Sequence, residues 1–209
     1  MALTARFITL EGGEGVGKST QAEQLAAAIR ERGKRVIVTR EPGGTPGAEA
    51  IRALLMTGAE ERWSARAEAL LFAAARSDHV DRVIRPALER GDWVISDRYI
   101  DSTRVYQGGA GAVEEADIFA LHRIACAGLM PDRTLLMTLG SDEATRRATA
   151  RDGARADRFA ARGLDYHAGL NAAFARLAIG EPERFRSIDA SGSPDVVTAR
   201  LVASIGDLL

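Results

Sequence analysis

The stretch Gly12-Gly13-Glu14-Gly15-Val16-Gly17-Lys18-Ser19-Thr20 fits the pattern G-x-x-x-x-G-K-[ST]. The residues before it, 7–11, are predicted to form a short buried strand, and residues 21–32 carry apolar side chains at helical spacing. When a strand, a glycine-rich loop and a helix follow in this order, the backbone N–H groups of the loop can cradle phosphates. Lys18 can then reach the β- and γ-phosphates, and the Ser19 hydroxyl can bind Mg²⁺. We therefore predict a nucleoside triphosphate site.

An incidental lysine in a glycine-rich turn is the alternative interpretation of this stretch. Lys18 and Lys34 are the only lysines among the 28 basic residues of the chain. A lysine at the one position where the motif requires it is therefore hard to ascribe to chance, and phosphate binding is favoured.

Size and composition limit the remaining possibilities. The 209 residues suffice for one α/β domain over residues 1–209 and are few for two. The formal net charge is −1, so no global field favours binding to nucleic acid or to an anionic membrane surface. Cys126 is the only cysteine, which excludes an internal disulfide. With neither a signal-peptide pattern nor a long apolar run, we expect a cytoplasmic protein that binds no nucleic acid and no membrane.

Short apolar strands alternate with helices along the chain. Strands are expected at residues 7–11, 35–40, 93–97, 134–139 and 185–189, and helices at 21–32, 48–56, 65–90, 114–127, 164–179 and 194–209. A polar loop is expected at residues 102–112. The alternation predicts an α/β fold, a doubly wound five-stranded parallel sheet with helices on both faces. Ligands of such sheets lie beyond the carboxyl ends of the strands, where the chain places Glu14, Glu41, Asp97 and Arg98.

Several classes of protein with a phosphate-binding loop are excluded by what the chain lacks. Neither lysine lies in an N-K-x-D element of the kind with which Ras-like GTPases read guanine, and no L-S-G-G-Q-like signature of an ABC-type ATPase is present. Asp97 is followed by Arg98, whereas an AAA-type motor would carry two adjacent acids there. The small size, this Asp-Arg pair and an arginine-rich stretch late in the chain favour a nucleoside monophosphate kinase.

Four blocks of sequence make this inference more specific. They are residues 11–20, the Thr39-Arg40-Glu41-Pro42-Gly43-Gly44-Thr45 loop, Phe72-Ala73-Ala74-Ala75-Arg76, and Asp97-Arg98-Tyr99-Ile100-Asp101-Ser102-Thr103 with Tyr106-Gln107-Gly108-Gly109. Through these blocks, in this order, the chain resembles the bacterial thymidylate kinases over nearly its whole length. The resemblance implies a P-loop NTPase fold, a homodimer, and transfer of the γ-phosphoryl group of ATP to dTMP with Mg²⁺.

The resemblance also implies how the base is read. Phe72 would stack on the thymine ring and Arg76 would donate to a carbonyl oxygen of the base; four residues apart, they share one helix face. From spacing alone, core packing beside Leu70 and Leu71 is the better interpretation of Phe72. The pyrimidine edge would be bonded by two loop residues, Thr103 and Gln107.

Other residues would contact the sugar and the acceptor phosphate. Tyr106 would pack where a 2′-hydroxyl would project, which favours deoxyribose, and Tyr166 would line the same pocket. Arg98 and Arg52 would hold the acceptor phosphate. The two acids of the site would be Glu14, near the 3′-hydroxyl, and Glu41, which would contact either Mg²⁺ or the acceptor.

The implied catalytic group is Lys18, Asp97 and Arg98, with Ser19 and Asp97 as the residues that would hold Mg²⁺. ATP would be bound by the whole of residues 12–20, by Arg147, and by Ala190 and Ser191 at the adenine site.

An arginine-rich stretch is predicted to form a lid over about residues 141–163. Five arginines lie around Gly153, namely Arg146, Arg147, Arg151, Arg155 and Arg158. A solvated basic helix, offset by nearby acids, is the alternative interpretation. The phosphate-binding loop itself holds no arginine, so a lid arginine is expected to neutralise charge in the transition state, with Arg158 the first candidate and Arg151 the next. Ala160 departs from the glutamate that relatives often carry there.

Two other functions stay open at this point. One is a kinase for another pyrimidine monophosphate such as dUMP, which a panel of acceptors would separate from a dTMP kinase. The other is a regulator that binds nucleotides without turnover, against which the presence of Lys18, Asp97 and Arg98 argues.

The lid hypothesis predicts that Arg158→Ala lowers kcat far more than it raises KM for either nucleotide. An arginine at this point of a phosphoryl transfer is worth about 10³–10⁵ in rate. Steady-state kinetics with both nucleotides varied checks the prediction, and near-normal turnover of the variant would exclude the lid arginine.

Overall fold

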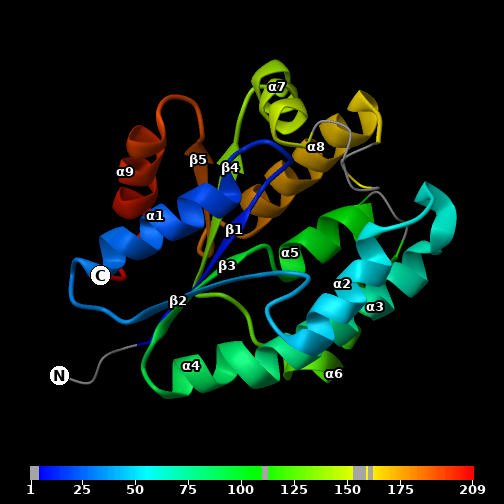
Figure 1. Cartoon of the computed structure of the whole chain (residues 1–209), viewed down its shortest axis with the longest axis horizontal. Coiled ribbons are helices and arrows are strands. Elements are labelled where there is room, and N and C mark those ends of the chain that lie inside the picture. The colour runs from blue at the N-terminus through cyan, green and yellow to red at the C-terminus, as the bar shows by residue number, and fades with distance from the viewer. Residues whose placement is uncertain (1–4, 110–112, 153–158, 160–161) are drawn as a thin grey trace.

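The computed structural model describes residues 5–109, 113–152, 159 and 162–209. Its strands are β1 (Phe7–Glu11), β2 (Val36–Arg40), β3 (Trp93–Asp97), β4 (Arg133–Thr138) and β5 (Phe185–Asp189). Within the described residues these strands form a five-stranded, wholly parallel sheet in the order β2-β3-β1-β4-β5 (Figure 1). The predicted sheet is confirmed.

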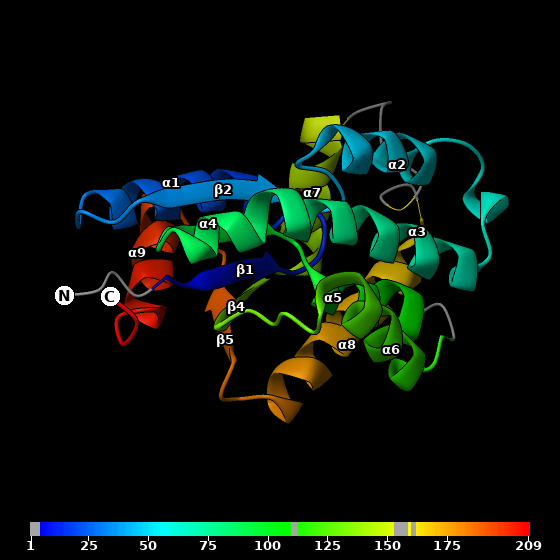
Figure 2. The same cartoon turned by 90° about the horizontal axis from the view of Figure 1, so that it is seen from below.

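Helices surround this sheet. They are α1 (Lys18–Arg30), α2 (Pro46–Met56), α3 (Ala65–His79), α4 (Arg85–Glu89), α5 (Ile100–Thr103), α6 (Glu115–Cys126), α7 (Ser141–Asp152), α8 (Leu164–Gly180) and α9 (Pro194–Ser204). Shorter helical turns are η1 (Glu60–Arg62), η2 (Val80–Ile84) and η3 (Arg104–Gly109). No helix in the described ranges is both long and apolar enough to cross a membrane. Figure 2 shows that β1 runs toward α5 and α7.

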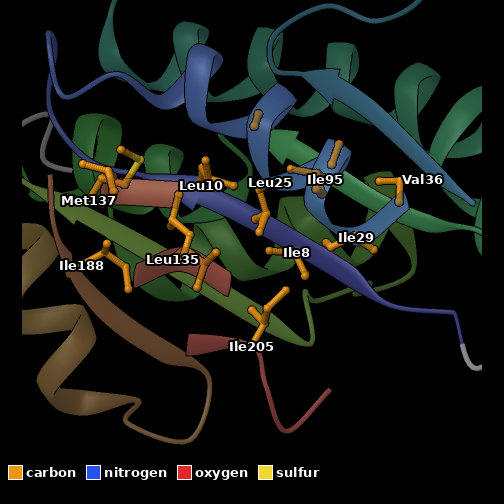
Figure 3. Packing of buried hydrophobic residues seen from close by; sticks show 14 of the residues in the cluster. Ile8, Leu10, Leu25, Ile29, Val36, Ile95, Leu135, Met137, Ile188 and Ile205 are labelled. Atoms are coloured by element: carbon orange, nitrogen blue, oxygen red, sulfur yellow. The ribbon is translucent and has the colours of Figure 1, made fainter. Parts of the chain in front are cut away.

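The core is divided between the two faces of the sheet because successive side chains of a strand point to opposite sides. Ile8 of β1 packs with Leu25 of α1 on one face (Figure 3), in a cluster that also includes Leu201 of α9. Its neighbour Phe7 packs on the other face, in a cluster that includes Ile118 of α6. Helices therefore cover both faces, as the doubly wound prediction required.

The register of the strands brings their carboxyl ends together. Leu10 of β1 pairs with Asp97 of β3, and Asp97 pairs with Arg40 of β2. Backbone bonds continue past the strand ends, since the N–H of Glu41 donates to the carbonyl of Asp97 at 2.9 Å and the N–H of Arg98 to that of Leu10 at 3.0 Å. The residues that follow β2 and β3 consequently meet at one edge of the sheet.

The expectation of a polar loop at residues 102–112 was wrong over its described part. Residues 100–109 are helical, as α5 and the π-helical turn η3. Thr103, Val105 and Gln107 are buried there, against α3 and α8. Gly108 and Gly109 favour a turn locally, but the burial of these side chains outweighs that preference.

Helix limits also differ from expectation. α9 ends at Ser204 and not at residue 209, α2 begins at Pro46 and not at residue 48, and two further places differ in ways that bear on the site. The helix expected at residues 65–90 is α3, η2 and α4 in direct succession, with Pro86 in the first turn of α4. Proline has no N–H to donate back along the helix, and the π-helical turn η2 accommodates that loss. At the other place, α1 begins at Lys18 and not at residue 21, so that lysine belongs to the first helical turn.

A buried carboxylate joins the helical segment after β3 to the sheet. Asp101 of α5 is fully buried and accepts bonds from Arg184 at 2.6 and 2.9 Å, from Arg104 at 3.0 Å and from the Thr134 hydroxyl at 3.2 Å. The two arginines also pair with Glu181, at 2.6 Å in each case. A single anion thus connects α5, η3, β4 and the segment before β5.

We expect Asp101→Asn to destabilise the protein by about 3–5 kcal/mol, because removal of one partner leaves buried charges uncompensated. Equilibrium unfolding in urea measures the change. Asp81→Asn is the matched control, since the Asp81–Arg85 pair is 4.0 Å apart and exposed, and it should cost at most about 0.5 kcal/mol. Equal effects of the two substitutions would contradict this account of Asp101.

Candidate active site

Lys18 belongs to the P-loop, the name used below for residues 12–20, and its side chain turns back toward the start of the loop. Its Nζ donates to the carbonyl of Gly12 at 3.1 Å and to that of Gly13 at 2.7 Å. Burial, together with the charge of Arg98, lowers the pKa of Lys18 to about 8. The two carbonyl oxygens carry only partial negative charge, whereas an anionic phosphate in the loop would balance the full positive charge of the Lys18 ammonium group.

Two glycines of the P-loop allow close approach of neighbouring backbone. Gly12 has φ +135°, and a Cβ there would lie 2.3 Å from the carbonyl oxygen of Met137 in β4. Gly15 has φ +75°, and a Cβ would lie 2.1 Å from the carbonyl oxygen of Ala144 in α7. Both positions therefore require glycine. The second contact also places α7, the first part of the predicted lid, directly against the P-loop.

Ser19 and Asp97 meet beside the loop. The Ser19 hydroxyl donates to Asp97 Oδ2 at 2.5 Å. A hydroxyl and a carboxylate oxygen side by side suit Mg²⁺, which takes oxygen ligands and usually keeps waters and substrate phosphates as the others. Over residues 5–109, 113–152, 159 and 162–209, no group of three or more His, Cys, Asp or Glu could hold a metal ion.

Arg98 is turned back over the P-loop. Its φ is +73°, a left-handed conformation that non-glycine residues seldom adopt. In this conformation its guanidinium donates to the Gly12 carbonyl at 3.1 Å, to the Ser102 hydroxyl at 3.0 Å and to Glu14 Oε1 at 2.6 Å. It also lies over the Tyr106 ring, 5.2 Å from the centroid. The sequence predicted a role for Arg98 but not its backbone conformation.

Glu11, at the end of β1, fixes the segment after Arg98, and the sequence prediction gave it no role at the site. Its carboxylate accepts from the Tyr99 N–H at 2.8 Å and from the Ser102 hydroxyl at 2.7 Å. Burial, and then the charge of Asp101, raise the pKa of Glu11 to about 7, against the opposing charge of Arg98. An acid at the end of a short buried strand was the signal that could have revealed it.

A cavity of about 470 Å³ lies between the P-loop and α3. On the P-loop side its lining includes Glu14, Gly15, Gly17, Lys18 and Ser19. Asp97 and Arg98 line it as well. The other predicted residues in its lining are Glu41, Arg52, Phe72, Arg76, Thr103, Tyr106 and Gln107. The structure therefore brings nine of the ten residues predicted for dTMP to one cavity.

Aromatic rings close one end of this cavity. Phe159, which the sequence prediction did not assign, lies 6.1 Å from Phe72 and 5.9 Å from Tyr106, measured between ring centroids. Tyr166 is absent from the lining that the described residues provide; it lies 6.4 Å from Tyr106. Phe72 thus faces a ligand-sized space with other rings around it, and does not serve only as core packing.

Polar side chains at the same end are already bonded to one another. Arg76 donates to Glu41 Oε2 at 2.7 Å and to Thr103 Oγ1 at 3.0 Å. Arg52 donates to the carbonyl of Pro42 at 2.8 Å, and Gln107 donates to Glu68 Oε2 at 3.1 Å. The groups predicted to contact the base, and Arg52, predicted to contact the acceptor phosphate, therefore have protein partners before a ligand arrives.

A second cavity, of about 410 Å³, lies on the other side of the P-loop. Gly15 and Gly17 line both cavities, so the loop separates two adjoining sites. The predicted residues that line this one alone are Val16, Thr20, Arg147 and Ala190, and the unpredicted ones are Gln21, Gly192, Pro194 and Val197. Ser191, predicted beside Ala190, is instead bonded through its N–H and hydroxyl to Asp189, at 2.9 and 2.8 Å.

The lid is only partly described. Arg147 donates to Glu143 at 2.8 Å and to the Ala190 carbonyl at 3.4 Å, which joins α7 to the second cavity. Arg155 and Arg158 lie outside the described residues, and of Arg151 only the helical backbone is described. The hypothesis of a lid arginine stays a prediction.

Comparison with known proteins identifies the family. A family model described as thymidylate kinase matches residues 10–201. The chain is 56% identical to a thymidylate kinase of Rhizorhabdus wittichii, over 99% of this chain and all of that one. It is 50% identical to a thymidylate kinase of Caulobacter vibrioides, over 93% of each chain. A crystal structure of thymidylate kinase from Ehrlichia chaffeensis superposes with a TM-score of 0.77 at 28% identity, covering 96% of this chain and 98% of that one. The resemblance predicted from the sequence is confirmed: the chain belongs to the thymidylate kinase family.

Proposed function

We propose that the chain transfers the γ-phosphoryl group of ATP to the phosphate of dTMP, forming dTDP. The observation that carries this proposal is the position of Arg98. It lies in the lining of the larger cavity, bonded to the Gly12 carbonyl and to Glu14 of the P-loop. A cation there can contact an acceptor phosphate in the larger cavity and the triphosphate held by the P-loop.

The smaller cavity is the proposed site of the adenosine part of ATP, with its phosphates passing over Gly15 and Gly17 toward Lys18. Ser19 and Asp97 would hold Mg²⁺, which when bound would neutralise charge on the β- and γ-phosphates. Arg147, which already contacts the Ala190 carbonyl, would cover the nucleotide from α7.

The larger cavity is the proposed site of dTMP. Its thymine would lie against Phe72, with Arg76, Thr103 and Gln107 along the edge of the base. Tyr106, packed under Arg98, would fill the space of a 2′-hydroxyl. These positions agree with the roles that the family resemblance implies.

Arg98 and Arg52 are then proposed to hold the acceptor phosphate, and Glu14 to direct Arg98. A phosphate oxygen is already ionised at neutral pH, so the protein need not supply a strong general base. Its task is to align the two phosphates and to neutralise charge as the phosphoryl group passes between them. The predicted lid arginines would complete that neutralisation when α7 and the residues after it close over ATP.

Exposed apolar side chains on α3 and α6 support a homodimer, which the resemblance also implies. Leu70 on α3 is 57% exposed and Ile124 on α6 is 81% exposed, and these two helices pack against each other. Large apolar side chains gathered on neighbouring helices are typical of a protein–protein interface. We propose that this surface joins two copies of the chain.

The purified protein should form dTDP from ATP and dTMP in the presence of Mg²⁺, with dTMP preferred over dCMP, CMP and AMP. Lys18→Met should lower kcat by at least about 100-fold, since it removes a charge aimed at the transferring phosphates. Chromatographic separation of the nucleotides follows each product. A preference for another monophosphate, or absence of turnover with every acceptor, would contradict the proposal.

The dimer proposal predicts that Ile124→Lys weakens self-association by at least about 10-fold, because a charge would have to be desolvated at the interface. Ile179→Lys is the matched control, since Ile179 is 80% exposed but lies on α8. Sedimentation equilibrium measures both dissociation constants. The interface assignment fails if the wild type is monomeric or if only the α8 variant dissociates.

A further inference from the structure

Arg76 is oriented by a carboxylate that is itself held from behind. Arg76 is only 3% exposed, and its Nε donates to Glu41 Oε2 at 2.7 Å. The other oxygen of that carboxylate, Oε1, lies 3.1 Å from Nδ1 of His79. Arg76 and His79 are three residues apart near the end of α3, so one helix face presents both to Glu41. The two carboxylate oxygens are thus divided between a cavity residue and a buried histidine.

His79 is fully buried and takes no part in the lining of the larger cavity as the described residues define it. Its Nε2 lies 2.6 Å from the hydroxyl oxygen of Thr39 on β2. A Cβ on Gly44 would lie 2.7 Å from both the His79 ring and the Thr39 hydroxyl. Gly44, at φ +88°, therefore lets the loop after β2 close directly over this pair.

The bonding pattern assigns a direction to each proton. A carboxylate only accepts, so Nδ1 of His79 donates to Glu41. In a neutral ring Nε2 is then the acceptor, and the Thr39 hydroxyl donates to it. Thr39, His79 and Glu41 form a chain of bonds that leads to Arg76, whose Nη2 also donates to Thr103 Oγ1 at 3.0 Å. Every N–H group of the guanidinium is a donor.

We propose that His79 is a positioning residue for base selection, acting through Glu41 on Arg76. This inference rests on the proposed function, in which Arg76 donates to a carbonyl oxygen of thymine. Because His79 and Arg76 each bond to one oxygen of the Glu41 carboxylate, Arg76 presents its N–H donors to the base in one defined position. A pyrimidine with an oxygen at position 4 accepts there, whereas cytosine presents an amino group and leaves a buried donor unpaired.

Loss of the bond between His79 and Glu41 would weaken the selection of the base and would leave the contacts to the phosphates unchanged. A Glu41 carboxylate held only by Arg76 could rotate with it, and the guanidinium could move to accommodate a donor on the base. The cost should therefore fall on KM for the acceptor and on discrimination between bases, and not on the transfer step.

Two substitutions at one position test this. In His79→Asn the amide nitrogen lies where Nδ1 was and can still donate to Glu41. In His79→Gln the amide lies where Nε2 was, next to Thr39, and leaves Glu41 Oε1 without its donor. We expect His79→Gln to raise KM for dTMP by about 10-fold or more and to reduce the preference for dTMP over dCMP by a similar factor, while His79→Asn stays within about 3-fold of the wild type.

The readouts are kcat and KM for dTMP, dCMP and ATP, with thermal unfolding recorded for each variant. In His79→Gln, kcat with dTMP and KM for ATP should remain within about 3-fold of the wild type. The control is His122→Gln, at another buried histidine, whose Nε2 contacts the Leu129 carbonyl at 2.8 Å. It should leave base selection unchanged even where it lowers the unfolding temperature.

Several results would overturn the inference. The first is an unchanged preference for dTMP over dCMP in His79→Gln. The second is an equal loss of that preference in His79→Asn and His79→Gln, and the third is the same loss in His122→Gln. Should His79→Gln fail to fold, Thr39→Val removes the outer hydroxyl of the chain, and unchanged selection in that variant would count against the proposal. If the wild type itself does not phosphorylate dTMP, the proposed function fails. That outcome is distinct from one in which the wild type and His79→Gln both phosphorylate dTMP with the same base selection, which overturns only the role of His79.

Discussion

The site depends on one constraint, the left-handed backbone of Arg98. A residue after β3 in ordinary conformation would continue away from the strand end, whereas φ +73° turns this arginine toward the Gly12 carbonyl and Glu14. The conformation costs about 1–2 kcal/mol in a residue with a Cβ. Glu11 offsets that cost, since it binds both the Tyr99 N–H and the Ser102 hydroxyl and so holds the next turn in place.

The sheet order explains why this arginine could contact both of the proposed ligands. β1 lies between β3 and β4, so the P-loop that follows β1 adjoins Asp97 and Arg98 on one side and the backbone of Met137 on the other. The loop after β2 reaches the same edge and brings Glu41 under Arg76. Two cavities then share Gly15 and Gly17 as their common wall. In the proposed function, the two nucleotides would lie head to head across this wall without a large rearrangement of the sheet.

The sequence was informative where a residue's chemistry and its local pattern agree. Lys18 after four glycines, and Asp97-Arg98 after an apolar strand, could be placed at the site because strand ends converge in a parallel sheet. Residues whose role depends on distant partners could not be found in this way. The local sequence assigns no role at the site to His79 or Glu11, and the folded contacts with Glu41 and Ser102 reveal what they hold. Burial likewise made a helix of residues 102–109, where the glycine-rich pattern had favoured a loop.

The central claim is that Arg98, in this backbone conformation, lies between the donor and acceptor phosphates. The most direct measurement is a crystal structure with a bisubstrate analogue in which adenosine and thymidine are joined by five phosphates. The account predicts a positive φ at Arg98, its guanidinium within hydrogen-bond distance of the phosphate nearest the thymidine, and the thymine ring on Phe72. A thymidine bound outside the larger cavity, or an Arg98 side chain directed away from the phosphates, would contradict it.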